Sequence, residues 1–330
     1  MELLNRSNYN LIRKSRESVP ERLGRWSTAK KIGTVALFVV LGFAWFSFYL
    51  FWGTVRPGKA ALGGTPEQYF LNAERVSVTA ADRVRLSGWL IPRAERSGNT
   101  AIILLHGYPA AKSDLLPLAA AMHPHFATLL LDMRYFGESG GRMTTLGFRE
   151  RKDIQKAVDL LASRGYAKIG VFGVSLGGAV GFMAAAEDAR IGAVAAYAPF
   201  SDLGSMADET YGRFGPLRIV LTEPMFLWAR LFFGEDPRIV SPFSVAPGFA
   251  KPVFLVHNRP DEQISFRNAQ RLEVALRGNP YAEFYFPESG GHQDIPADLY
   301  PRLIDFFSRS LGAADRLVAA RDRERPPTAR

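Results

Sequence analysis

Five short runs of almost continuous apolar residues constrain the fold of this chain more than any other feature. Such runs are typical of strands that are covered on both faces, and segments with helical periodicity separate them. An alternating pair of strands within 76–91 and a strand at 281–286 bring the predicted strands to eight. Alternating strands and helices predict a mostly parallel sheet with helices on both faces. The five runs lie at 101–105, 127–131, 168–172, 191–197 and 252–256.

The third run leads into a glycine-flanked serine, Gly173-Val174-Ser175-Leu176-Gly177, and small residues typical of a helix follow. A Gly-x-Ser-x-Gly turn between strand and helix holds its serine in a strained conformation and lets the two elements approach closely. An ordinary glycine-rich turn has the same pattern, and the chain contains 30 glycines. The strand before the turn and the helix after it favour Ser175 as a nucleophile.

The composition is that of a globular protein, with 330 residues, 22% charged and 47% hydrophobic. This length suits one large domain or two ordinary ones. The lack of cysteine excludes disulfides, cysteine-based metal sites and a thiol nucleophile. The net charge is +9, and residues 1–31 contribute +5 of it through eight basic and three acidic residues. This distribution favours a membrane flank over a nucleic-acid surface.

Residues 32–55 carry no formal charge and are rich in Phe, Leu, Val and Trp. A helix of that length, at about 1.5 Å per residue, crosses a hydrocarbon core of about 30 Å. A cleaved signal peptide and a buried core helix are alternatives, but the run is long for a signal and no convincing cleavage site follows it. Basic residues are more frequent before the run than after it, which predicts a single-pass type II protein with a cytoplasmic N-terminus. The chain after residue 55 is then on the extracytoplasmic side of the membrane. In a bacterium, this side is the periplasm or the outer face of the membrane.

The candidate acid and base follow later strands, whose carboxyl ends are where catalytic groups of such sheets gather. Asp261 lies in a short loop after the fifth run. Glu262 and Asp202 are alternatives for the acid, and chain order favours Asp261. The candidate base is His292, on a Gly-Gly loop after the last predicted strand. It is the only one of five histidines that follows both Ser175 and the acid.

The loop after the first run begins with His106 and Gly107. His106 precedes the nucleophile in the chain, so we expect a structural histidine whose ring braces the loop. Gly107 lets the backbone turn so that the N–H of Tyr108 points at a developing oxyanion. The N–H of Leu176, directly after the nucleophile, is the second expected donor.

The order of Ser175, Asp261 and His292 and the motifs around them resemble the α/β-hydrolase superfamily over roughly residues 76–311. Membrane-anchored ABHD-type enzymes, monoacylglycerol lipases and prolyl oligopeptidases are similar in layout. One departure concerns loop shape: Asn258 follows His257 where these families often carry glycine. The motifs that carry the resemblance are His106-Gly107, 132–140, 173–177, Asp261 and Gly291-His292.

The resemblance implies a serine hydrolase that cleaves a carboxylic ester or thioester by two-step acyl transfer. His292, oriented by Asp261, would take the Ser175 proton, and no metal or organic cofactor would be required. The expected partners are a small acyl ester, lipid-like in one interpretation, and the membrane, with no nucleic acid. A serine peptidase on the same fold and a catalytically silent membrane-tethered binding protein are the alternatives.

The predicted organisation has five parts, and the fourth is an α/β-hydrolase domain with an apolar cap at 202–251. The cap either packs as a helix pair on the core, or lines an acyl pocket or touches the bilayer. An acyl pocket predicts that loss of Phe226 or Trp228 harms long-chain esters most. Asp132 and Arg134 are expected to form a local structural pair. The five parts are a basic cytoplasmic segment (1–31), an anchor (32–55), a linker (56–70), the hydrolase domain (71–312) and a fraying helical tail (313–330).

Overall fold

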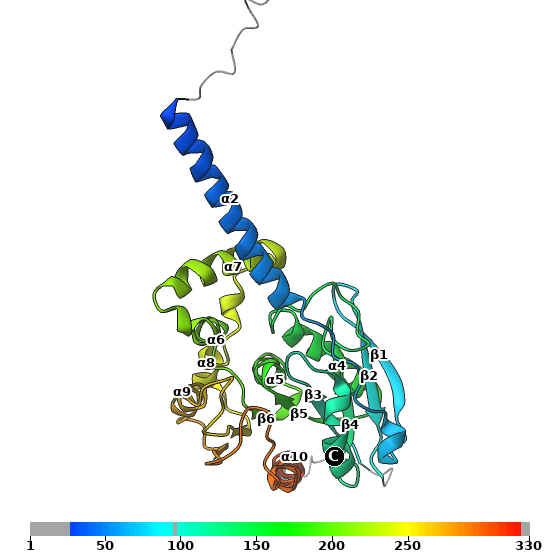
Figure 1. The fold of residues 1–330 in the computed structure, drawn as a ribbon. Coiled ribbons are helices and arrows are strands. Elements are labelled where there is room, and N and C mark those ends of the chain that lie inside the picture. The colour runs from blue at the N-terminus through cyan, green and yellow to red at the C-terminus, as the bar shows by residue number, and fades with distance from the viewer. Residues whose placement is uncertain (1–26, 95–97, 325–330) are drawn as a thin grey trace, which may run out of the picture. The chain divides into compact units, whose positions relative to one another are not determined.

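The computed structural model describes residues 27–94 and 98–324 (Figure 1). The chain consists of two compact units, Met1–Phe46 and Ser47–Arg330. Helix α2, Thr28–Val55, contributes to both, so its last turns belong to the second unit. The boundary between the units therefore lies inside the predicted anchor. Residues 1–26 of the basic segment predicted at 1–31 lie outside the described part of the chain.

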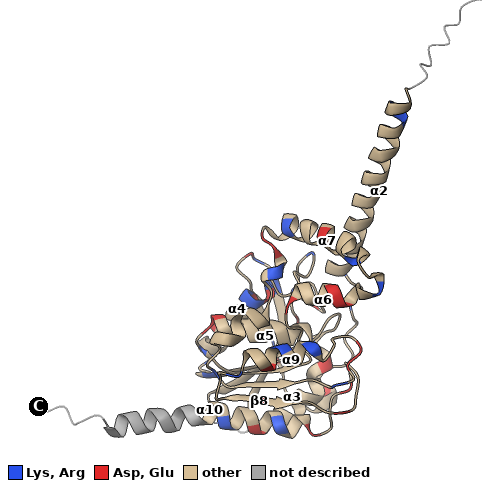
Figure 2. Ribbon diagram, turned by 90° about the vertical axis from the view of Figure 1, so that its left-hand side faces the viewer, with Lys and Arg blue, Asp and Glu red and all other residues tan. Residues whose placement is uncertain are grey.

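The described part of the first unit is the beginning of α2, whose apolar side chains are exposed. Its charged residues are Lys30 and Lys31, at the start of the helix, and the remainder carries none (Figure 2). Among the described helices, α2 alone is long and apolar enough to cross a membrane by length and composition. A signal sequence or a core helix meets the same criterion.

The second unit is built on an eight-stranded sheet in the order β1-β2-β4-β3-β5-β6-β7-β8. β2 pairs antiparallel with β1 and with β4, and the other neighbours are parallel. The predicted mostly parallel sheet is confirmed. Its strands are β1 (Glu74–Thr79), β2 (Arg85–Ile91), β3 (Thr100–Leu105), β4 (Ala127–Leu131), β5 (Lys168–Val174), β6 (Ile191–Tyr197), β7 (Val253–Val256) and β8 (Ala282–Tyr285).

Helices cover both faces of the sheet, which explains the continuous apolar runs. Along β3, Ile103 and Leu105 belong to one hydrophobic cluster, while Ile102 and Leu104 belong to another. The first cluster includes side chains of α4 (Glu150–Ser163), α5 (Leu176–Glu187) and α9 (Arg267–Ala275). The second includes side chains of α3 (Leu116–Met122) and α10 (Leu299–Glu324). Every strand between these two layers needs apolar residues on both faces.

The segment between β6 and β7, predicted from the sequence to be a cap, contains three helices: α6 (Leu203–Thr210), α7 (Leu217–Phe233) and α8 (Pro242–Val245). The predicted tail, 313–330, is helical to Glu324 as the end of α10, and 325–330 lie outside the described residues. Short 3-10 helices complete the unit: η1 (Pro66–Tyr69), η2 (Lys112–Leu115), η3 (Gly212–Phe214), η4 (Pro237–Ile239) and η5 (Ala246–Gly248).

The predicted pair of Asp132 and Arg134 does not form. Asp132 is fully buried and binds Lys112 of η2, accepting from both its backbone N–H and its ammonium group. Arg134 donates to Asp153 of α4 and to Asp82. The prediction was wrong because the chain turns after β4, so the two side chains leave it toward different elements.

Candidate active site

Ser175 lies at the turn between β5 and α5 in a backbone conformation that few residues adopt. Its φ is 52° and its ψ is −116°, outside the regions that residues with a Cβ favour. A Cβ at Gly173 would collide with the carbonyl group of Gly177. A Cβ at Gly177 would lie 2.5 Å from the carbonyl oxygens of both Leu105 and His106. Both glycines are needed because strand, helix and the loop after β3 meet at this turn.

A direct hydrogen bond joins His292 to Asp261. His292 Nδ1 lies 2.7 Å from Asp261 Oδ2. Asp261 Oδ1 accepts from the backbone N–H groups of Gln263, at 2.9 Å, and Ile264, at 2.8 Å. Burial raises the pKa of Asp261, but the hydrogen bonds from His292 and Ile264 outweigh burial and hold this pKa below its ordinary value. A carboxylate fixed in this way orients an imidazole so that Nδ1 carries the proton and Nε2 is free to accept one.

The two alternative acids bind other groups. Glu262 Oε2 accepts from the backbone N–H of His292 at 3.2 Å and thus holds the loop. Asp202 caps the N-terminus of α6, where it accepts from the N–H of Ser205 at 2.7 Å. It also forms an ion pair with Arg271 at 2.7 Å. Of the three carboxylates, Asp261 is the one bonded to the ring.

His106 is buried and braces the loop after β3, as the sequence predicts. Its Nδ1 donates to the carbonyl oxygen of Gly107 at 2.7 Å, and its Nε2 accepts from the N–H of Met133 at 3.0 Å. Burial lowers the pKa of His106, which keeps the ring neutral. Since both ring nitrogens are occupied, neither is available to act as a base.

The two expected oxyanion donors lie beside the serine turn. A Cβ at Gly107 would be 3.5 Å from Ser175 Cβ, so this loop packs against the turn. Tyr108 follows, and its hydroxyl donates to the carbonyl oxygen of Thr54 at 2.9 Å. Leu176 is the first residue of α5, so its N–H has no partner within the helix. Tyr108, Ser175 and Leu176 line the same cavity.

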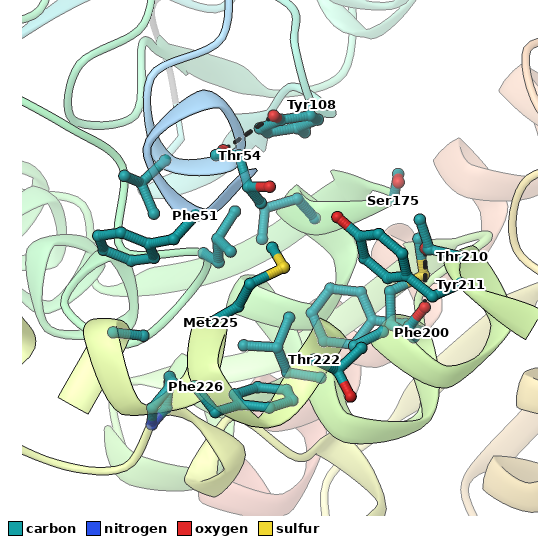
Figure 3. Close-up of a pocket in the computed structure, with 18 of the residues that line it drawn as sticks. Phe51, Thr54, Tyr108, Ser175, Phe200, Thr210, Tyr211, Thr222, Met225 and Phe226 are labelled. Atoms are coloured by element: carbon teal, nitrogen blue, oxygen red, sulfur yellow. Dashed lines mark hydrogen bonds between the residues drawn. The ribbon is translucent and has the colours of Figure 1, made fainter. Parts of the chain in front are cut away.

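That cavity has a volume of about 410 Å³, and both Ser175 and His292 line it. Figure 3 shows the hydroxyl of Ser175 at its edge, with Phe51, Thr54, Met225 and Phe226 around it. The walls are mostly apolar, and no Lys, Arg, Asp or Glu is among the described residues that line them. Three helices supply most of the wall: α2 (Phe51, Thr54, Val55), α6 (Leu203, Met206, Ala207, Thr210) and α7 (Thr222, Met225, Phe226, Ala229, Phe233).

The two cap aromatic residues named from the sequence have different surroundings. Phe226 lines the cavity, and Trp228 instead packs on the end of α2. The Trp228 indole N–H donates to Ser47 Oγ at 3.1 Å. Within the part of the chain that the structure describes, no group of three or more His, Cys, Asp or Glu is placed to hold a metal ion.

Comparisons with known proteins identify the family. The family model for the alpha/beta hydrolase fold matches residues 100–217, which include the serine turn. The esterase Pf2001 of Pyrococcus furiosus is similar in structure, with a TM-score of 0.65 and 25% sequence identity over 78% of this chain and 98% of the esterase. The chain belongs to the α/β-hydrolase superfamily.

Other proteins that are similar to this α/β hydrolase match different fractions of its length. The protein YfhR of Salmonella typhi is 27% identical over 280 residues, which are 78% of this chain and 87% of YfhR. The protein YqkD of Bacillus subtilis is 32% identical over 172 residues, 50% of this chain and 55% of YqkD. The acylaminoacyl peptidase of Pyrococcus horikoshii has a TM-score of 0.57 and 18% identity over 73% of this chain and 42% of its own. At that identity the peptidase shares the fold alone.

Sequence reasoning missed what Asn258 does in this hydrolase. Its side-chain amide Nδ2 lies 2.9 Å from the carbonyl oxygen of Gly291, 2.8 Å from that of Asp294 and 2.9 Å from the hydroxyl of Tyr197. The amide therefore ties the loop that carries His292 to the end of β6. The signal was the departure from glycine at this position, which was interpreted as a matter of loop shape.

The last turns of α2 were missed as well. Their apolar residues continue the span before them without a break in composition, so the sequence assigns them to the anchor. In the structure Phe51 and Val55 are buried in the second unit.

Proposed function

We propose that this α/β hydrolase is a membrane-anchored serine hydrolase that cleaves a carboxylic ester or thioester with Ser175, His292 and Asp261. One observation carries the proposal: the 2.7 Å hydrogen bond between His292 and Asp261 lies beside a cavity that His292 and Ser175 line together. The strained turn at Ser175 supports the same assignment, because the surrounding glycines maintain it at the edge of that cavity.

In the proposed reaction, His292 Nε2 accepts the hydroxyl proton of Ser175 as Oγ attacks the carbonyl carbon of the substrate. The N–H groups of Tyr108 and Leu176 donate to the oxyanion that forms, and one such donor is worth about 2.7–4 kcal/mol in comparable enzymes. His292 then gives its proton to the leaving alcohol or thiol, and the acyl group remains on Ser175. A water molecule attacks the acyl-enzyme by the same route and releases the carboxylic acid.

The lining of the cavity favours an uncharged ester over a peptide. A peptidase that binds a charged peptide terminus needs an opposite charge in its site, because an unpaired buried charge is costly. The described residues that line this cavity supply neither a carboxylate nor a cationic side chain. The similarity to an esterase at 25% identity supports the same substrate class.

The proposed function is tested with the full chain in detergent, on a series of 4-nitrophenyl esters and of aminoacyl 4-nitroanilides. We expect ester turnover that Ser175→Ala abolishes. Turnover of the anilides alone would replace the esterase with a peptidase. Absence of both turnover and fluorophosphonate labelling in the folded wild type would leave the catalytically silent binding protein.

We propose that α2 is the anchor, with the N-terminus cytoplasmic and the hydrolase unit on the other side. The chain has no cysteine, so single cysteines introduced at Ser7 and Ser308 report on topology without background. In sealed vesicles whose outer surface is the extracytoplasmic face, an impermeant maleimide should label position 308 and spare position 7. The reverse pattern would overturn the orientation. If neither position of the vesicle-bound protein is labelled, both positions lie inside the vesicle.

A further inference from the structure

We infer that the cavity is a site for a long, uncharged acyl chain. Three residues in the last turns of α2, Phe51, Thr54 and Val55, form the wall that limits the length of that chain. The inference rests on the proposed function and names its substrate class. It gives the end of the apolar helix a part in substrate selection, in addition to any part in anchoring.

The end of α2 is built into the site. Phe51 and Val55 are 2% and 1% exposed, and both line the cavity together with Thr54. The Thr54 carbonyl oxygen accepts from the hydroxyl of Tyr108, whose own N–H is an expected oxyanion donor (Figure 3). The Val55 carbonyl oxygen accepts from the N–H of Thr144 at 3.0 Å. Displacing this helix end would therefore open the cavity and remove a support of the loop beside Ser175.

Aromatic side chains set the spacing between α2 and the facing cap helix α7. The Phe51 ring lies 5.4 Å from that of Phe232 and 6.2 Å from that of Phe233, measured between centroids. The Phe48 ring meets Trp228 edge-on at 5.3 Å. Each such aromatic contact adds to the packing of the two helices. The cavity wall is thereby continuous from one helix to the other.

The chemistry of the wall selects the ligand. A volume of about 410 Å³ falls within the usual range of small-molecule sites, about 300–1,000 Å³. In an apolar cavity, each methylene group removed from water strengthens binding about fourfold. A charged or strongly polar chain would lose its hydration without a partner in the wall. An ester of a long saturated or unsaturated acyl chain fits these conditions.

The outer surface of α7 indicates a bilayer as the source of this chain. Leu217, Leu227 and Leu231 are 64%, 58% and 64% exposed. Exposed apolar side chains on a single helix suit the membrane interface. Trp228 of α7 also donates to Ser47, which lies within the apolar helix α2 and is the first residue of the second unit.

The test compares two substitutions in the same turn of α2 in the full chain. Thr54→Phe adds a ring at a cavity-lining position, whereas Gly53→Phe adds one where nothing lies within 4 Å of a Cβ. With 4-nitrophenyl dodecanoate, we expect Thr54→Phe to lower kcat/KM at least tenfold. With 4-nitrophenyl butanoate, the loss should stay below threefold. Gly53→Phe should change neither by more than twofold.

Fluorophosphonate labelling of Ser175 monitors the intact active site in each variant. If Thr54→Phe labels like the wild type and loses both esters equally, the end of α2 does not limit chain length and the inference is overturned. Should Thr54→Phe fail to fold, Phe51→Ala provides the opposite change: it enlarges the cavity and should raise the ratio of hexadecanoate to dodecanoate turnover. An unchanged ratio would overturn the inference. A wild type that hydrolyses no ester would instead overturn the proposed function.

Surface dilution tests the source of the chain. The full chain is reconstituted in phosphatidylcholine vesicles with a fixed bulk concentration of 4-nitrophenyl dodecanoate. If the chain enters from the bilayer, adding substrate-free lipid to the same vesicles lowers the rate in proportion to the mole fraction of ester. A rate that follows bulk concentration alone would overturn delivery from the bilayer.

Discussion

Replacing Asn258 with alanine should slow catalysis more than its effect on stability explains. Asn258 is 1% exposed and lies next to the loop that carries His292. Its side-chain amide has two hydrogens and faces three acceptors at 2.8–2.9 Å, so it makes two good hydrogen bonds at a time. A net contribution of about 1 kcal/mol for each gives about 2 kcal/mol that holds the loop in place.

If this free energy positions His292, its loss lowers kcat by up to about 30-fold, since 1.4 kcal/mol corresponds to a factor of ten. We expect this drop in kcat with 4-nitrophenyl butanoate, accompanied by slower fluorophosphonate labelling of Ser175. Asn258→Gly, which restores the residue common in similar families, removes the same hydrogen bonds and should lose kcat to a similar extent.

Asn279→Ala is the matched control. Asn279 is also buried, donates to the carbonyl oxygen of Lys251 at 2.8 Å and accepts from the N–H of Tyr281 at 2.9 Å. It precedes β8, at the end of the strand away from the candidate site. Its loss should lower the melting temperature about as much as Asn258→Ala while leaving kcat within twofold. Equal kcat values in the two variants would refute a positioning role for Asn258.

Three further predictions concern the acid, the buried histidines and the serine turn. Asp261→Asn should lower kcat by about 10³–10⁴-fold. Asp202→Ala, which removes the side chain that caps α6, should cost about 1 kcal/mol of unfolding free energy and leave kcat intact; equal losses of kcat would contradict the assignment. Burial lowers the pKa values of His106 and His257 in the folded chain. Below the ordinary histidine pKa of about 6.5, the unfolded chain therefore binds more protons than the folded chain. The stabilisation is complete above pH 6.5 and is lost as the pH falls. The unfolding free energy should therefore fall from pH 6.5 to 5 by up to about 1.4 kcal/mol per pH unit for each histidine. His257→Asn should make this dependence of the unfolding free energy on pH less steep. An unfolding free energy that does not change between pH 6.5 and 5 would refute the reasoning. Gly177→Ala should destabilise the fold by more than about 3 kcal/mol, because the added Cβ meets two backbone carbonyl groups. A Cβ at Gly278 has no atom within 4 Å, so Gly278→Ala should change stability by less than about 1 kcal/mol. Similar melting temperatures for the two variants would contradict the packing at the serine turn.

The sheet was predictable from the sequence because both of its faces are covered. Strands such as β3 must then be apolar at every position, and that composition is visible without coordinates. The serine turn was predictable for a similar local reason, since only glycine fits at 173 and 177. Asp261 and His292 were named from chain order, and the structure brings those two side chains into contact.

The features that were missed depend on direction and on partners, which composition does not report. An apolar residue that faces lipid and one that faces protein have the same composition, so the entry of Phe51 and Val55 into the second unit left no mark in the sequence. Asp132 and Arg134 are two positions apart, yet a turn after β4 sends them to Lys112 and Asp153. The hydrogen bonds of Asn258 depend on how two distant loops meet.

The most direct measurement of the proposed chemistry is to identify which residue carries the acyl group during turnover. The full chain is mixed with 4-nitrophenyl dodecanoate, quenched in acid within milliseconds, digested and examined by mass spectrometry. We predict a dodecanoyl group on the peptide that contains Ser175 and no adduct in Ser175→Ala. An acyl group on a different residue of the wild type, or undiminished ester turnover by Ser175→Ala, would contradict Ser175 as the nucleophile.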